Sequence, residues 1–562
     1  MNILLSLMLL SLAATPTRTV SVETQDQFDR LRQTVITALD AGYKDVRVEF
    51  KSKGPFYFSQ NHLNLTGQVY PEASVSFEGN GAIMIAEGEK YTSGSRYKGD
   101  FKPDRTVLSG DFEDIDIWSN MYRASGRISA SGKEKGVYKI ICPNVRASKA
   151  DHAYILLTES YQSHYYEVVK IEDGAVSIKA DDPEVLNLDM SYAGKGARFK
   201  ICNASGSSLS IAKDKGKVHI CSAGRILSSY GANFKSLSFK GFHFIGNSSE
   251  GGSLFDFTDV TSSSIVISSC EFRNLHTNIA MASNADNFTF SDNIVEHCYA
   301  GGVTSLNPSK NTKVTGNRFE ECGLSLNMTS CVDCSGEDYY VADNQFINFG
   351  SRAITLGVYF TREKAGLSSG IVERNLIKYE GDWLENPDYY TIMDTGAIYL
   401  CTLNDNAVIR FNRICRFTGQ RSNRGIFCDD GASGFSIYGN VITGIANSYC
   451  IDSRRVASVE SRLKSGKSNV NNNIRDNVLD GPIRFEGRSS GGNCRKSANY
   501  LISNNPGGIP EMMISSVTVE KSDVILKYSS IDDTVIKLPR SSYRKLRRWK
   551  YFNEMGTYFA VE

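Results

Sequence analysis

Histidine is scarce in this sequence, and all seven histidines lie before residue 300. A Ser–His–Asp or Cys–His catalytic site in the later part of the chain is therefore excluded, and no H-E-x-x-H metal motif occurs anywhere. Excess charge is absent as well, because 63 Lys and Arg stand against 62 Asp and Glu. Proteins that bind nucleic acid through electrostatics carry a basic excess, so we expect no nucleic-acid partner.

Long apolar runs are also missing. No stretch of eighteen apolar residues occurs, so we expect no membrane-spanning helix. The sequence MNILLSLMLLSLAA at the N-terminus is apolar, too short to span a bilayer, and ends in small residues, although it has no Lys or Arg. This pattern predicts a signal peptide over 1–18 and an exported protein, periplasmic or extracellular. The oligomeric state is left open.

Proline is rare (12 residues), whereas glycine (48) and the pair of Phe and Tyr (28 each) are plentiful, which favours short strands and tight turns. The thirteen cysteines are scattered, and only Cys331 and Cys334 lie close together. A zinc site needs a second pair or histidines at ligand spacing, so we expect no metal site. Most cysteines fall at strand positions predicted to point inward, where Cys packs as a small apolar residue.

One pattern recurs from about residue 234 onward: an apolar residue, Asn three positions later, and another apolar residue two positions after that. The asparagines are Asn293, Asn317, Asn344, Asn375, Asn412, Asn440 and Asn477. A strand with alternating polarity follows, as in 302–306, 353–357, 397–401 and 425–429. Such periods predict a right-handed parallel β-helix with a ladder of stacked Asn side chains. A propeller or sandwich would need several antiparallel strands in each unit.

The rest of the chain departs from this repeat and sets the predicted domains. Residues 19–91 should form an N-terminal cap with a helix over 25–41 and the first coils. Residues 92–230 lose the Asn motif and show alternating strands, which predicts an inserted antiparallel β-module. The main β-helix is expected over 231–505 and a C-terminal cap over 506–562, so the fold class is all-β.

Acidic residues are the best candidates for chemistry. If the later strands are aligned by their first inward residues, two outward columns result: Tyr399, Phe427, Ile451 and Arg484, then Cys401, Asp429, Ser453 and Glu486. Neighbouring coils lie about 4.8 Å apart, so Asp429 and Glu486 would stand about 9–10 Å apart. That is at the wide edge of the separation used by inverting glycosidases. The same alignment places Asp333 and Asp452 inward.

Other candidates surround this face. Asp430 ends the Asp429 strand beside Arg454, and Asp394 lies in the turn before the Tyr399 strand. Trp383 and Tyr389 belong to a long connection that precedes Asp394. Exposed aromatic rings beside an acidic face suit stacking on sugars, whereas the alternative is that Asp429 and Asp430 form an ordinary turn and the rings only pack the loops. The expected substrate contacts are Tyr399, Trp383, Tyr389, Phe427, Arg454 and Arg484.

These motifs carry a resemblance. Asp394-Thr-Gly-Ala-Ile-Tyr399, followed by Gly425-Ile-Phe-Cys-Asp-Asp430-Gly-Ala-Ser-Gly434, resembles bacterial β-helix proteins grouped with glycoside hydrolases, within the pectate-lyase-like superfamily. An inserted β-barrel between early coils is similar to the β-helix α-galactosidases. The paired-Asp, Gly-His-Gly arrangement of polygalacturonases is absent. The resemblance implies a carbohydrate-active solenoid over about 234–505.

We therefore expect a glycoside hydrolase that acts on a polysaccharide or other glycan, with Asp394, Asp429, Asp430 and Glu486 as candidate acids and no cofactor. A polysaccharide lyase is the first alternative, with Arg454 or Arg484 among its candidate bases and Ca²⁺ as a possible neutraliser of charge. A glycan-binding solenoid without catalysis is the second. A lyase makes an ultraviolet-absorbing product, a hydrolase makes only reducing ends, and a binder makes neither.

Overall fold

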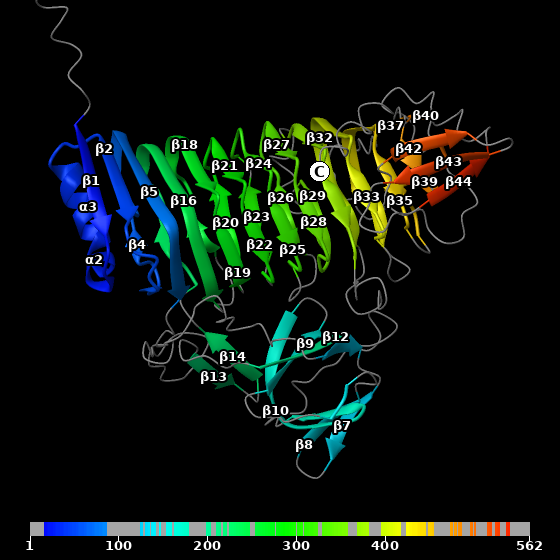
Figure 1. Cartoon of the computed structure of the whole chain (residues 1–562), viewed down its shortest axis with the longest axis horizontal. Coiled ribbons are helices and arrows are strands. Elements are labelled where there is room, and N and C mark those ends of the chain that lie inside the picture. The colour runs from blue at the N-terminus through cyan, green and yellow to red at the C-terminus, as the bar shows by residue number, and fades with distance from the viewer. Residues whose placement is uncertain are drawn as a thin grey trace, which may run out of the picture.

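The structure is a computed structural model of the whole chain. It describes residues 16–86, 124–127, 130–134, 137–141, 145–147, 153–159, 162–178, 198–203, 210–214, 217–221, 224–247, 253–275, 277–298, 301–306, 308–323, 329–357, 368–380, 395–417, 423–445, 448–453, 472–475, 477–479, 481–485, 495–497, 500–501, 514–519, 523–528 and 535–539. The fold is a right-handed parallel β-helix with an inserted antiparallel module, as the repeat predicts (Figure 1).

Each coil of the solenoid contributes one strand to each of three parallel sheets. Sheet 1 precedes the Asn bend and contains β1(Thr17–Val22), β2(Asp45–Phe50), β18(Thr261–Ser268), β21(Phe288–Ser291), β24(Lys313–Thr315), β27(Tyr339–Ala342), β30(Gly370–Glu373), β37(Asn473–Arg475) and β40(Arg495–Ser497). Sheet 2 follows the bend and contains β3(Phe56–Phe58), β19(Glu271–Leu275), β22(Ile294–Glu296), β25(Arg318–Glu320), β28(Gln345–Ile347), β31(Leu376–Lys378), β33(Arg413–Cys415), β35(Val441–Thr443), β38(Val478–Leu479) and β41(Tyr500–Leu501).

Sheet 3 completes each coil. It contains β4(Leu63–Asn64), β15(Leu227–Ser228), β17(Ser253–Asp256), β20(Asn278–Ser283), β23(Val303–Leu306), β26(Ser330–Cys334), β29(Arg352–Leu356), β36(Ile451–Ser453) and β39(Ile483–Phe485). Four long strands bend from one sheet into the next: β5(Val69–Ala86) and β16(Asn233–Asn247) join sheets 1 and 2, whereas β32(Gly396–Arg410) and β34(Arg424–Tyr438) join sheets 3 and 1.

The Asn ladder predicted from the spacing is confirmed. In each step the side-chain oxygen of one Asn accepts hydrogen bonds from both the backbone N–H and the side-chain amide of the Asn in the preceding coil. Between Asn317 and Asn344 these bonds measure 3.0 and 2.9 Å. Every ladder Asn is buried, so the amides satisfy backbone groups that the bend removes from the strand hydrogen bonding.

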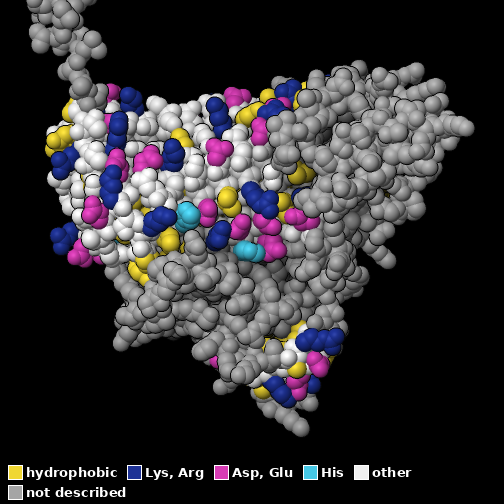
Figure 2. All heavy atoms as spheres, in the orientation of Figure 1, with side chains coloured by type: hydrophobic (Ala, Val, Ile, Leu, Met, Phe, Trp, Pro, Cys, Tyr) yellow, Lys and Arg dark blue, Asp and Glu magenta, His cyan; other side chains and the backbone are white. Residues whose placement is uncertain are grey.

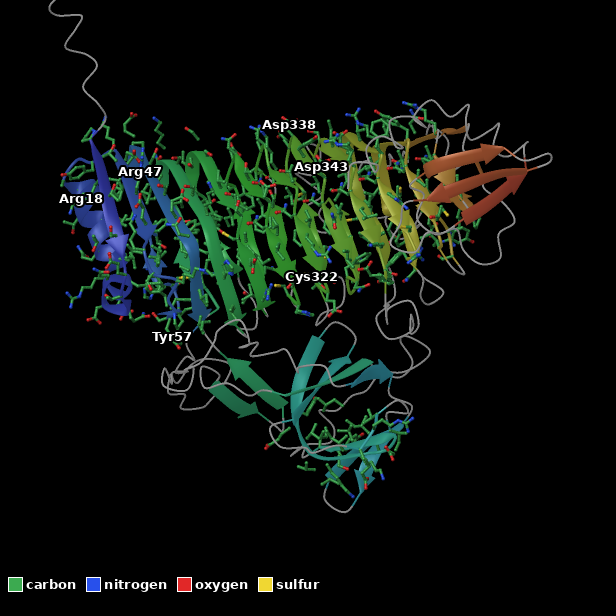
Figure 3. All side chains as sticks on the ribbon, in the orientation of Figure 1. Arg18, Arg47, Tyr57, Cys322, Asp338 and Asp343 are labelled. Atoms are coloured by element: carbon green, nitrogen blue, oxygen red, sulfur yellow. The ribbon has the colours of Figure 1, made fainter. Side chains whose placement is uncertain are left out.

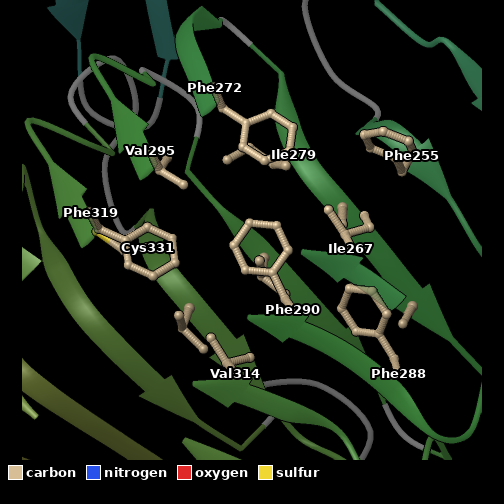
Figure 4. Packing of buried hydrophobic residues seen from close by; sticks show 14 of the residues in the cluster. Phe255, Ile267, Phe272, Ile279, Phe288, Phe290, Val295, Val314, Phe319 and Cys331 are labelled. Atoms are coloured by element: carbon tan, nitrogen blue, oxygen red, sulfur yellow. The ribbon is translucent and has the colours of Figure 1, made fainter. Parts of the chain in front are cut away.

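The bore of the solenoid is filled with apolar side chains, because alternate residues of each strand point inward. Phenylalanine rings from sheets 1 and 2 fill much of this bore, and Figure 4 shows part of their packing. Ring centroids lie 5.8 Å apart between Phe272 and Phe290 and 5.0 Å apart between Phe319 and Phe346. Nine cysteines of the solenoid are buried, which agrees with the packing role predicted for them.

The N-terminal cap consists of two short helices rather than one. α2(Gln25–Asp29) begins at Thr24, whose hydroxyl accepts from the Gln27 N–H while the Gln27 side chain accepts from the Thr24 N–H. α3(Leu31–Asp40) follows directly, and its buried Leu31, Val35 and Leu39 pack on the first coils. Figure 1 places both helices at the N-terminal end of the solenoid.

Strand β1 overlaps the end of the predicted signal peptide. Thr17 and Arg18, the last residues of the predicted signal peptide over 1–18, pair with Asp45 and Val46 in the first coil. Residues 1–15 lie outside the described residues. Among the described helices, none is long and apolar enough to cross a membrane.

The inserted module contains the antiparallel strands that the sequence predicts. They are β6(Ala124–Arg127), β7(Ala130–Glu134), β8(Val137–Ile141), β9(Ala153–Glu159), β10(Gln162–Glu172), β11(Ala175–Ile178), β12(Arg198–Asn203), β13(Ser210–Asp214) and β14(Lys217–Cys221). Three further antiparallel strands, β42(Ile514–Val519), β43(Asp523–Tyr528) and β44(Val535–Pro539), lie at the C-terminal end of the solenoid in Figure 1.

Acidic and basic side chains are scattered among uncharged ones on the solenoid face that Figure 2 shows, and several ion pairs join neighbouring coils. On sheet 2, Arg273 lies 3.2 Å from Glu296 of the next coil, and His243 lies 3.2 Å from Glu271. These side chains are partly exposed, so we regard them as ordinary surface pairs worth less than about 1 kcal/mol each.

Candidate functional site

The outward face of sheet 3 carries a continuous column of side chains, one from each coil, which we call the outer column. Its members are Asp256, Met281, Thr304, Asp333, Thr355, Tyr399, Phe427, Asp452 and Arg484. Four members carry ionisable side chains, and all four are partly or fully buried: Asp256, Asp333, Asp452 and Arg484. Buried charge outside an apolar core is costly, so this face is the best candidate for function.

Two aromatic rings lie at the centre of the outer column. Tyr399 and Phe427 pack edge to face with ring centroids 5.4 Å apart, and with Cys401 they form an apolar cluster separate from the core. We expected these rings to stand exposed, and that expectation is wrong, because Tyr399 is 1% exposed and Phe427 is 0% exposed.

Two arginines explain part of this burial. The Arg352 guanidinium carbon lies 3.4 Å from the centroid of the Tyr399 ring, and that of Arg424 lies 3.9 Å from the centroid of Phe427. Each guanidinium therefore covers an aromatic face and gains a cation–π contact. Sequence reasoning missed both arginines. The sequence signal for them is a shared spacing, because Arg352 lies three residues before Thr355 and Arg424 lies three residues before Phe427.

Asp429 lies two residues beyond Phe427 and opposite Cys401, as predicted. Its side chain is only 8% exposed, and its Oδ2 accepts a 2.9 Å hydrogen bond from the Tyr399 hydroxyl of the preceding coil. Burial raises the pKa of Tyr399, and the charge of Asp429 raises it further against the opposing effect of Arg352. Tyr399 is therefore a neutral donor, and Asp429 is a buried acceptor held in one position.

Asp452 corrects the predicted register. We expected it to point inward with Ile451 outward, but Ile451 pairs with Ile426 and Asp452 pairs with Phe427 on the outer face. Arg424 donates from Nε to Asp452 at 2.6 Å. Arg484 donates from Nε and Nη2 at 2.7 and 2.6 Å. Asp452 is 0% exposed, so its charge is balanced by two guanidinium groups, as a buried carboxylate requires.

The same correction moves Ser453 but leaves Arg484 in its predicted column. Ser453 pairs with Cys428 and so does not share a column with Asp429, whereas Arg484 follows Asp452 in the outer column as its neighbour in the next coil. The Arg484 guanidinium also lies over the Tyr449 ring, 4.5 Å from its centroid.

Asp333 is the second acid whose predicted direction is wrong. It lies outward, between Thr304 and Thr355 in the outer column. Burial raises its pKa to about 7, and the nearby positive charge of Arg352 opposes that rise. Its Oδ1 is buried and has no hydrogen-bond partner among the described residues.

Several predicted site residues fall outside the part of the chain that the structure describes. These are Asp394, Glu486, Trp383, Tyr389 and Arg454, together with the side chain of Asp430. Within the described ranges, no group of three or more His, Cys, Asp and Glu side chains is placed to hold a metal ion. The described polar groups of the face are thus carboxylates, guanidinium groups, the hydroxyls of Thr304 and Thr355, and the buried phenol of Tyr399.

Comparisons with known proteins add little to this geometry. No family model and no curated protein matches the chain. Among solved structures, the tailspike protein gp49 from Pseudomonas phage LKA1 is similar at 11% identity and a TM-score of 0.21, covering 81% of this chain and 70% of that one. The Gp54 tailspike of Acinetobacter baumannii bacteriophage AP22, solved with A. baumannii capsular saccharide, is similar at 10% identity and a TM-score of 0.15, covering 80% and 78%. At these scores neither structure indicates what this chain binds.

Proposed function

We propose that the chain is an exported glycoside hydrolase whose active site lies on the outward face of sheet 3 around Asp429. The observation that carries the proposal is the bond from the buried Tyr399 hydroxyl to the nearly buried Asp429 carboxylate. A carboxylate that is shielded from water and fixed by a neutral donor is the kind of group that general acid–base chemistry needs.

Glycoside hydrolysis uses two acids with different roles. Asp429 accepts the phenol O–H, which suits the carboxylate that activates water or attacks the sugar. Asp430, the adjacent residue, and Asp394, which precedes the Tyr399 strand, are the proposed donors of a proton to the leaving oxygen, with Glu486 as a further candidate. The roles of these three acids rest on the sequence alone.

The described arginines and aromatic rings support this site rather than contact the sugar. Tyr399 and Phe427 are buried under guanidinium groups, so we assign them to positioning Asp429. Trp383, Tyr389 and Arg454 keep their proposed role as substrate contacts. Arg484 is a poor candidate for the base of a lyase, because two of its nitrogens donate to Asp452.

The test is a panel of neutral and acidic polysaccharides incubated with the purified chain, with reducing ends and ultraviolet-absorbing unsaturated products measured in parallel. We expect reducing ends alone, lost in Asp429→Asn and reduced in Asp430→Asn. Glu271→Gln, which changes a partly exposed carboxylate on sheet 2, is the matched control and should keep full activity. An unsaturated product that survives both Asp substitutions would show a lyase and refute the proposal.

A further inference from the structure

A buried carboxylate oxygen on the outer column has no partner among the described residues. Asp333 Oδ1 is shielded from water and accepts no hydrogen bond. An oxygen in that state costs about 1–3 kcal/mol or more, and buried polar atoms in native proteins nearly always have a partner. A hydrogen-bond donor supplied by a ligand would remove this cost.

The groups around Asp333 define what such a ligand must be. The Ser330 and Thr355 hydroxyl oxygens lie 2.6 Å apart, and Thr355 is the neighbour of Asp333 in the outer column. Arg352, which is 6% exposed, lies close enough to act on the Asp333 carboxyl electrostatically. The site therefore combines a carboxylate acceptor, a pair of hydroxyls and a fixed positive charge.

This combination excludes two classes of ligand. A metal cation would meet Arg352, and the described residues offer no set of three metal ligands. An anion would meet the Asp333 carboxylate. A neutral polyol satisfies all of the groups, because its hydroxyls donate to the carboxylate oxygen and accept from Ser330, Thr355 or a guanidinium N–H.

We propose that Asp333, Ser330 and Thr355 form a subsite for one hydroxyl-rich sugar unit, separate from the catalytic acids. This inference rests on the proposed glycan substrate. Asp333 and Phe427 are three strand steps apart in the outer column, which is about 14 Å at the spacing of parallel strands. The subsite therefore holds a sugar several units away from the bond cut near Asp429, and it favours long chains over short ones.

The experiment compares wild type, Asp333→Asn and the control Asp338→Asn on a series of oligosaccharides of increasing length from whichever polysaccharide the panel identifies. Asp338 is an exposed carboxylate at the turn after the same coil, near the edge of the solenoid in Figure 3. Its backbone has a φ of 56°, which Asn tolerates well, and Asn keeps an acceptor for Ser369. Thermal unfolding of each variant verifies that it folds.

For Asp333→Asn we expect KM to rise about tenfold on the longest oligosaccharides, because a buried neutral amide oxygen accepts a sugar hydroxyl more weakly than a carboxylate does. We expect kcat to be unchanged and short substrates to be cleaved as by wild type. The Asp338→Asn control should match wild type at every length. Equal kinetics for wild type and Asp333→Asn at all lengths would overturn the subsite while leaving the hydrolase intact.

Direct binding separates the two proposals. If the chain binds glycans without cleaving them, the hydrolase fails, and the subsite still predicts about tenfold weaker binding of long oligosaccharides by Asp333→Asn in calorimetry. Unchanged binding in that variant overturns the subsite on its own. If no glycan binds or is cleaved, both proposals are wrong.

Discussion

Replacing Asn375 by Ala should destabilise the β-helix strongly, because this side chain connects three coils. Its amide donates to Val341 O at 2.9 Å, Glu373 O at 3.1 Å and Asn412 Oδ1 at 2.9 Å. Its Oδ1 accepts from the Asn344 N–H at 3.1 Å and the Asn344 amide at 3.0 Å. Asn375 is 0% exposed, so water does not replace these bonds.

The size of the effect follows from the groups that lose a partner. In the Ala variant the Asn344 backbone N–H loses its acceptor and Val341 O loses a donor. The Asn344 side-chain amide keeps its 2.8 Å bond to Val314 O, and Asn412 Oδ1 keeps the bond from the residue 375 N–H. Glu373 O keeps the bond from the Asp343 N–H. Two newly unsatisfied buried groups at about 1–3 kcal/mol each give a loss of about 4 kcal/mol.

Urea unfolding followed by circular dichroism measures this loss of stability, and hydrogen exchange at the backbone N–H of Asn344 shows where it occurs. The matched control is Asn473→Ala, which removes an outward, partly exposed Asn on β37 and should cost less than about 1 kcal/mol. Equal losses for the two variants, or unchanged exchange at Asn344, would refute the account of the ladder.

Three further predictions concern the outer column. Asp452→Ala removes the carboxylate between two guanidinium groups and should lower the free energy of unfolding in urea by about 3–5 kcal/mol. The control Glu271→Ala, at a partly exposed ion pair, should lower it by less than about 1 kcal/mol, and similar values for the two variants would contradict a buried ion pair at Asp452. Asp333 has a pKa of about 7 in the folded chain against 3.8 ordinarily, so between these pH values the folded state binds more protons than the unfolded state. The free energy of unfolding should therefore fall by up to about 4 kcal/mol as the pH rises from 4 to 7. The stability gained by Asp333→Asn over wild type should therefore grow from pH 4 to pH 7 in urea titrations, and a gain independent of pH would be inconsistent with a neutral carboxyl at low pH. Tyr399→Phe removes the donor to Asp429 and should lower kcat for glycan hydrolysis about tenfold without unfolding the chain, whereas an unchanged kcat would remove Tyr399 from the mechanism.

The fold could be predicted because its signal repeats. Each ladder Asn occupies the same bend, and each bend is followed by strands of period two, so several independent coils agree. The break between the two N-terminal helices at Arg30 could not be predicted from the sequence pattern, because the helical spacing of apolar residues continues across it.

The direction of two acids could not be predicted, for a shared physical reason. Cys331 and Val332 precede Asp333, and Cys450 and Ile451 precede Asp452; both members of each pair are 0% exposed. Two consecutive buried apolar residues allow either phase of the in–out alternation, and a shift by one residue turns every side chain to the opposite face. Strand pairing with the neighbouring coils decides the phase, and that information is not local in the sequence.

The burial of Tyr399 and Phe427 was also out of reach of the sequence pattern. Alternation assigns a side chain to the outer face but says nothing about what covers that face. Here part of the cover comes from Arg352 and Arg424, which reach back over the outer face from the start of their strands.

The most direct test of the central claim is a crystal structure of Asp429→Asn soaked with an oligosaccharide that the wild-type chain cleaves. We predict that the sugar lies along the outward face of sheet 3, with a glycosidic oxygen or anomeric carbon within hydrogen-bond or van der Waals distance of residue 429. A sugar bound on sheet 1, on sheet 2 or on the inserted module, with sheet 3 empty, would contradict it.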